Sequence, residues 1–176
     1  MIELYRSGAF VDPQLPNDNN HEARARIRAI ERYNRIWLRS YMHALWNTLL
    51  RRDSRLRSLP TDQHYAVARA GIPELRAVSI ACIVGSENRS SDFDRAFAPL
   101  NEHMEGRWIS VAMAWELGTG LPAVDLLQVG SEYYVRDGHH RISVAHAYGL
   151  REIDARVLVL QATQPAGTME LCAVAG

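Results

Sequence analysis

The chain of 176 residues contains no lysine, because all 20 of its basic residues are arginines. This absence excludes a P-loop lysine, a lysine Schiff base and a lysine general base. A site for phosphate would therefore have to be built from arginine side chains and backbone amides.

Cysteines and long apolar runs are also scarce. Cys82 and Cys172 have no metal-binding spacing, so neither a disulfide framework nor a zinc site is predicted. Cys82 lies in an apolar run, and we expect it to be a small buried side chain. No segment is long and apolar enough to cross a bilayer, and the N-terminus lacks a signal-peptide pattern. The sequence predicts a cytoplasmic protein without a membrane partner, and it leaves the oligomeric state open.

The composition is that of an ordinary globular protein, with 47% hydrophobic and 23% charged residues. The net charge is zero, but residues 1–76 hold 13 arginines and 8 acids, whereas residues 77–176 hold 7 arginines and 12 acids. A basic arm therefore precedes an acidic domain. Such an asymmetry indicates either contact with nucleic acid or docking of the two parts on each other.

We expect an irregular leader at 1–20 and an arginine-rich helical arm at 21–72. Within the arm, the first helix extends to about residue 52, and a second, short helix has Thr61 as its N-cap and Gly71 just beyond its end. Apolar residues recur at steps of three, four and seven and predict one buried face of the first helix. They are Ile27, Ile30, Trp37, Leu38, Tyr41, Leu45 and Leu49.

A second row of side chains on the same helix is basic. Charge along one helix face is usually solvated, but this row would also suit the phosphates of a nucleic acid or a protein interface. Its members, spaced by three or four residues, are Arg24, Arg28, Arg32, Arg35 and Arg39.

Strands and helices alternate after residue 73. The pattern predicts a buried strand at 75–84, a helix at 107–117, a hairpin at 121–138, a helix at 140–148 and a final strand from 152. This order predicts a compact α/β domain with a mixed sheet over 73–162, followed by a tail at 163–176.

The segment Asp137-Gly-His-His-Arg141 joins a predicted strand directly to a predicted helix. Unpaired N–H groups at such a helix start favour an anion, Gly138 would admit it to the backbone, and Arg141 could supply a bidentate fork. His139 and His140 add further donors. The alternative is an ordinary turn in which Asp137 caps the helix. No metal site is predicted, because neighbouring histidines on a helix point about 100° apart.

The same segment resembles the second box of the ParB/sulfiredoxin-like superfamily, and residues 78–94, VSIACIVGSENRSSDFD, resemble its first box. The resemblance covers about residues 75–160. It implies a ParB/sulfiredoxin-like fold in which Gly138–Arg141 hold the phosphates of a nucleotide, CTP or ATP/ADP with Mg²⁺. Ser86 and Arg89 of the first box would assist.

The sequence departs from two branches of this superfamily. His139 stands where sulfiredoxins have their catalytic cysteine, so sulfiredoxin activity is not expected. The chain ends soon after its last strand, so the DNA-binding domain of ParB partitioning proteins is not expected. In the free-serine kinases of the superfamily the first box supplies a general base, and Glu87 stands in that place, while Asp137 matches their acidic residue.

Two functions therefore remain open. The chain could be a ParB-like nucleotide-binding module whose arginine arm contacts nucleic acid or protein. Alternatively, it could be a small phosphotransferase or nucleoside triphosphatase with Glu87 or Asp137 as base.

Overall fold

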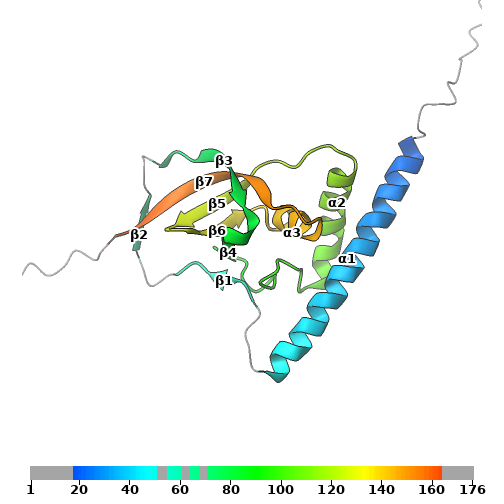
Figure 1. Ribbon diagram of the computed structural model, residues 1–176, viewed down its shortest axis with the longest axis horizontal. Coiled ribbons are helices and arrows are strands. Elements are labelled where there is room, and N and C mark those ends of the chain that lie inside the picture. Colours follow the sequence, from blue (N-terminus) through cyan, green and yellow to red (C-terminus); the bar gives the residue numbers. More distant parts are fainter. Residues whose placement is uncertain (1–17, 51–54, 61–63, 68–70, 164–176) are drawn as a thin grey trace, which may run out of the picture.

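The computed structural model describes residues 18–50, 55–60, 64–67 and 71–163. In this part of the chain the fold is α/β with a mixed sheet, as predicted. The helices are α1 (Asp18–Leu49), α2 (Glu105–Glu116) and α3 (His139–Ala147). Figure 1 shows α2 and α3 lying between the sheet and the long α1. No described helix combines the length and the apolarity needed to span a membrane.

The sheet is mixed and is centred on the long last strand. Its order over the described residues is β1-β4-β6-β5-β7-β2, and β3 also pairs with β7. The strands are β1 (Arg57–Ser58), β2 (His64–Val67), β3 (Glu74–Ser79), β4 (Ile83–Ser86), β5 (Val124–Val129), β6 (Glu132–Asp137) and β7 (Glu152–Thr163).

Several predicted elements are confirmed. Helix α2 corresponds to the helix expected at 107–117, and β5 and β6 form the expected antiparallel hairpin. Helix α3 is followed by Gly149 in the left-handed conformation, with φ of 73°, as expected for a helix-terminating glycine. Strand β7 is the predicted final strand.

The prediction of one buried strand at 75–84 is wrong. A 3₁₀ turn at Ile80–Cys82 divides this segment into β3, antiparallel to β7, and β4, parallel to β6. Strand β3 is an edge strand, so the side chain of Leu75 is 72% exposed. Cys82 is also exposed, contrary to prediction, because it lies in the turn that carries the chain from one side of the sheet to the other.

The predicted short helix after Thr61 is also wrong, because His64–Val67 form strand β2. β2 and β3 occupy different parts of the same edge of β7, and pairing there outweighs the local helical pattern. The predicted arm at 21–72 therefore contributes two strands, β1 and β2, to the sheet. The arm is therefore not a separate unit. Thr61, most of the leader and the tail after Thr163 lie outside the described residues.

Helix α1 forms as predicted, but only part of the expected apolar face, including Trp37, packs on the domain. The buried face carries Ala25, Ala29 and Tyr33, of which Ala29 and Tyr33 share a core cluster with Trp108 of α2 and Val144 of α3. Alanines let the helix backbones approach closely. Because this face is made largely of alanine, it did not stand out in the sequence as a stripe of large apolar residues. Large exposed apolar residues of α1 are Ile27, Leu38, Tyr41, Met42, Leu45, Trp46 and Leu49.

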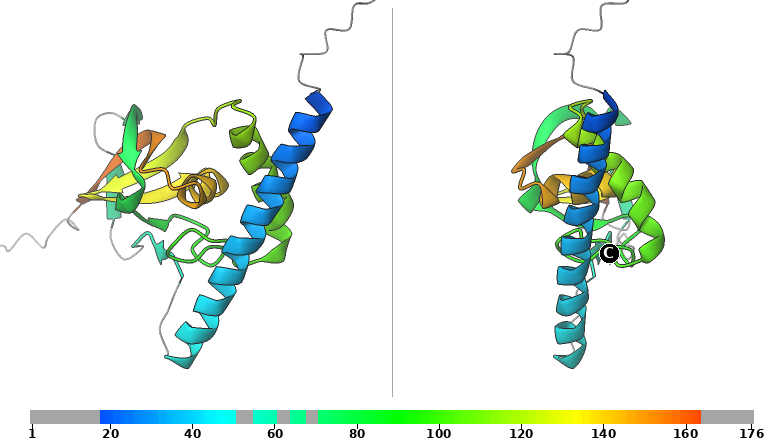
Figure 2. Two further views of the ribbon diagram at one scale, coloured as in Figure 1. Left: turned by 45° about the vertical axis from the view of Figure 1, so that its right-hand side comes forward. Right: turned by 90° about the vertical axis from the view of Figure 1, so that its right-hand side faces the viewer.

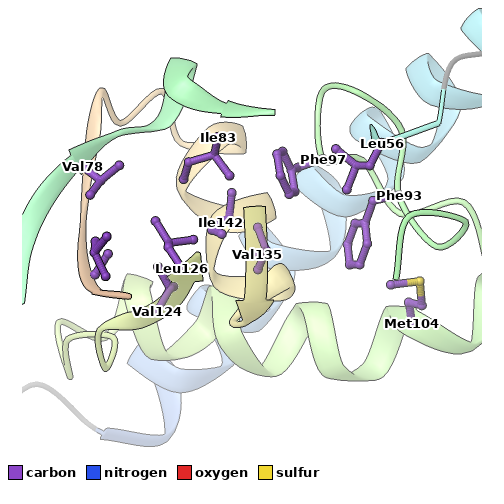
Figure 3. Close-up of a cluster of buried hydrophobic side chains, with 12 residues drawn as sticks. Leu56, Val78, Ile83, Phe93, Phe97, Met104, Val124, Leu126, Val135 and Ile142 are labelled. Carbon is purple, nitrogen blue, oxygen red and sulfur yellow. The ribbon is translucent and has the colours of Figure 1, made fainter. Parts of the chain in front are cut away.

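The main core lies between the sheet, α3 and the loop before α2. Figure 3 shows Val78, Leu126 and Ile142 among the side chains that fill it. Phe93 and Phe97 close the end of this core. The core therefore fixes the start of α3 against the sheet.

Candidate functional site

Helix α3 begins without a side-chain cap. Strand β6 ends at Asp137, Gly138 takes a left-handed φ of 99°, and the helix starts at His139. The Asp137 carboxylate forms an ion pair with Arg141 instead of capping the helix. The first N–H groups of α3 therefore keep the partial positive charge of a helix N-terminus.

Gly138 is required by its packing as well as by its backbone angle. A Cβ atom at this position would lie 2.6 Å from Cγ1 of Val124 in β5. The absence of a side chain thus lets the β6–α3 junction approach the start of β5.

A cavity of about 170 Å³ lies at this helix start. The structure brings the predicted residues at 137–141 together with the predicted Arg89. It adds two residues of α2 that the sequence did not indicate. The lining residues are Arg89, Arg107, Val111, Asp137, Gly138, His139, His140 and Arg141.

The Ser86 and His139 side chains are buried beneath the surface of the site and hold its parts in position. Ser86 is fully buried and His139 is only 3% exposed, and 2.7 Å separates the Ser86 Oγ from the His139 Nε2. The Ser86 hydroxyl also accepts the backbone N–H of Arg89 at 2.8 Å. His139 stacks on Phe93, with ring centroids 5.6 Å apart. Direct ligand contact by the Ser86 side chain is therefore not supported, and the two residues fix the Arg89 loop to α3.

Both histidines are held neutral at pH 7. Burial, followed by the charge of Arg89, lowers the pKa of His139 to about 4. Burial, Arg89 and Arg107 lower the pKa of His140 to about 4 as well. The Nδ1 atom of His140 is buried and has no hydrogen-bond partner among the described residues. This nitrogen has almost no accessible surface, so its missing partner is a cost in stability and not a contact offered to a ligand.

The prediction of a free guanidinium fork at Arg141 is wrong. Its Nη1 donates hydrogen bonds to the carbonyl oxygens of Pro122 at 2.8 Å and Ala123 at 2.6 Å, and its Nη2 pairs with Asp137. These contacts hold the segment before β5 against α3. Arg141 lines the cavity, but its hydrogen-bonding capacity is largely used by the protein.

Arg89 and Arg107 supply the available positive charge. The Nε of Arg89 pairs with Asp92 at 2.7 Å, which leaves its other nitrogens for a ligand. Arg107 is exposed in the first turn of α2, and among the described residues it forms no hydrogen bond or ion pair. A cation in the first turn of a helix is unfavourable to the helix dipole. That placement was the signal that could have singled out Arg107.

Glu87 does not lie in the cavity. Its carboxylate forms a two-point pair with Arg136, at 3.0 Å to Nε and 3.3 Å to Nη2. Arg136 projects from the exposed end of β6 beside the loop that carries Glu87. The expectation that Glu87 acts as general base at the helix start is therefore corrected, because its carboxylate is already paired with Arg136.

Part of the arginine row on α1 serves to dock the helix on the domain. Arg28 pairs with Glu116 at 2.7 Å. Arg32 donates to the carbonyl oxygen of Ala147 at 2.9 Å and lies 4.2 Å from the ring centroid of Tyr148. The charge asymmetry of the sequence thus serves docking in part, which was one of its two predicted explanations.

Comparison with protein-family models, with curated proteins and with solved structures finds no match to this chain. In the described part of the chain no three His, Cys, Asp or Glu side chains form a group that could hold a metal ion.

Proposed function

We propose that this protein binds a nucleotide by its phosphate groups at the N-terminus of α3. The observation that carries the proposal is the uncapped helix start facing a cavity lined by Arg89, Arg107 and His140. Helix N-termini stabilise anions through their free N–H groups and dipole. Guanidinium groups match phosphate oxygens in geometry and charge.

The size of the cavity supports phosphate rather than whole-nucleotide burial. Small-molecule pockets usually enclose about 300–1,000 Å³, so a cavity of about 170 Å³ suits the phosphate end alone. The ribose and base of CTP or ATP would lie outside it. Mg²⁺ would arrive with the phosphates, and the 67% exposed carboxylate of Asp137 at the rim could reach it.

Binding is favoured over phosphoryl transfer. The carboxylate of Glu87 is paired with Arg136, and that of Asp137 is paired with Arg141. A general base must be free to accept a proton from the attacking group. We therefore propose a ParB-like nucleotide-binding module and not a kinase.

Calorimetric titration of the full chain with CTP, ATP, ADP and GTP, with and without Mg²⁺, tests this proposal. At least one nucleotide should bind, and Arg107→Gln should weaken it at least tenfold. Arg95→Gln is the matched control, since Arg95 is also exposed but does not line the cavity. It should leave the affinity within twofold. If none of the four nucleotides binds, or if both variants lose affinity to the same extent, the proposal is contradicted.

A further inference from the structure

A second, larger cavity lies at the opposite end of α3, between that helix, α1 and the loop at 94–98. Its volume is about 340 Å³, within the range of small-molecule sites. Helix α3 has nine residues, so its two ends are about 12 Å apart. The two cavities share no lining residue.

One wall of this cavity is cationic. Arg35, Arg39 and His43 recur every fourth residue along α1 and so lie on one face. His146 reaches the cavity from the last turn of α3. Neither Arg35 nor Arg39 forms a hydrogen bond or ion pair with another described residue. Arg35 and Arg39 are exposed, so their positive charge lies at the solvent side of the cavity without a partner among the described residues.

The acid in this cavity does not neutralise those arginines. Asp94 is buried, and its carboxylate accepts hydrogen bonds from the Ser40 hydroxyl at 3.0 Å and from the backbone N–H groups of Ala96 at 2.9 Å and Ala98 at 2.8 Å. These bonds hold the loop in shape, with Phe97 between the two amides at a left-handed φ of 57°. Asp94 therefore builds the cavity wall.

The remaining wall is apolar and comes from three parts of the fold. Ile36 of α1, Ala96 and Phe97 of the loop, and Ala147 of α3 contribute to it. A cavity with cations on one side and aliphatic or aromatic groups on the other is complementary to a molecule that has an anionic group at one end and an apolar group at the other.

We infer that this cavity is a binding site for a small organic anion, a carboxylate or phosphate ester carried on an apolar ring. Arg35 and Arg39 hold the anionic group, with His43 and His146 as further hydrogen-bond partners. Ile36 and Ala147 contact the ring. The inference is independent of the nucleotide site at the other end of α3.

Three ring compounds test the charge requirement in the unmodified protein. Phenyl phosphate and benzoate are the anionic probes, and benzyl alcohol is the uncharged one. In calorimetric titrations the anions should bind at least tenfold more tightly than the alcohol. NMR of the imidazole groups should show shifts at His43 and His146. Equal affinity for all three probes, or shifts confined to His140, would overturn the inference.

Two double variants locate the site. Arg35→Gln with Arg39→Gln should weaken phenyl phosphate at least tenfold. The control, Arg24→Gln with Arg26→Gln, removes the same charge from exposed positions of α1 that do not line the cavity, and it should change the affinity less than twofold. Loss in the control as large as in the first variant would overturn the inference.

Discussion

The two histidines that open α3 show how burial sets the chemistry of single residues. At pH 7 both imidazoles are neutral, since burial and the neighbouring arginines lower each pKa to about 4. A neutral His140 leaves the positive charge of the cavity to Arg89 and Arg107. The buried Nδ1 of His140 has no hydrogen-bond partner among the described residues, which costs stability.

Acid should destabilise the protein through these histidines. In the unfolded chain their pKa returns to about 6.5, so between pH 6.5 and pH 4 the unfolded state binds more protons. The free energy of unfolding should therefore be highest above pH 6.5 and should fall as the pH drops toward 4. The full loss from His139, which is almost fully buried, is on the order of 3 kcal/mol and is reached near pH 4; about 2 kcal/mol of it falls between pH 7 and pH 5. Urea denaturation at pH 7 and pH 5 measures that part.

His139→Gln is the variant that isolates this contribution. Glutamine does not titrate, so the loss between pH 7 and pH 5 should be smaller than in the unmodified protein. Glu116 and Glu132 do not interfere, because their pKa values are lowered from 4.5 and their contributions disappear only at more acid pH. An unchanged pH dependence in the variant would show that His139 is not held neutral by the fold.

At the scale of the element, α1 is packed through its small side chains. Ala25 and Ala29 are fully buried, Ala29 lies in one cluster with Ala112 of α2, and Tyr33 packs beside Trp108 with ring centroids 5.5 Å apart. Close approach of two helices requires small residues at the crossing, and one large ring then fills the remaining space. Ile36 and Trp37 also pack against this cluster, whereas other large apolar residues of α1, such as Leu45, are exposed.

Two tyrosines of α1 provide a matched test of this packing. Tyr33 is 4% exposed, and Tyr33→Ala should lower the free energy of unfolding by about 3 kcal/mol through loss of buried contacts. Tyr41 is 51% exposed, and Tyr41→Ala should cost about 1 kcal/mol or less. Chemical denaturation measures both. The reverse order would mean that the predicted apolar face, and not the alanine face, packs on the domain.

At the scale of the whole molecule, α1 is held along only part of its length. Figures 1 and 2 show its end near Leu49 extending beyond α2. Its buried residues Ala25, Ala29, Tyr33 and Ser40 all precede that end. The same helix therefore has a packed part and a part whose backbone hydrogen bonds face solvent.

Hydrogen exchange should divide α1 accordingly. Amides at 25–36 should be protected to a degree comparable with α2, because opening them requires undocking from Trp108. Amides at 43–49 should exchange much faster, since few buried contacts oppose local opening. Exchange followed by mass spectrometry measures both segments, with the central strand β5 as a protected reference. Uniform protection along α1 would contradict the docking described here.

The candidate site was partly predictable. The segment at 137–141 was identifiable because a strand, a glycine and a helix start are all encoded within a few residues. The role of Arg141 was not, because its partners Pro122 and Ala123 are about twenty positions away. Arg107 was missed for the same reason: only the packing of α2 brings it to α3.

Local pattern determined the parts of this protein in which neighbouring residues decide the conformation: helices α1, α2 and α3, the β5–β6 hairpin, and the glycine at which β6 turns into α3. Tertiary structure decided the face of α1 that is buried, the division of residues 75–84 and the strand at 64–67. In each of these cases the competing partner, α2 or the long edge of β7, is distant in sequence. The free energy of burial and strand pairing there exceeds the local preference.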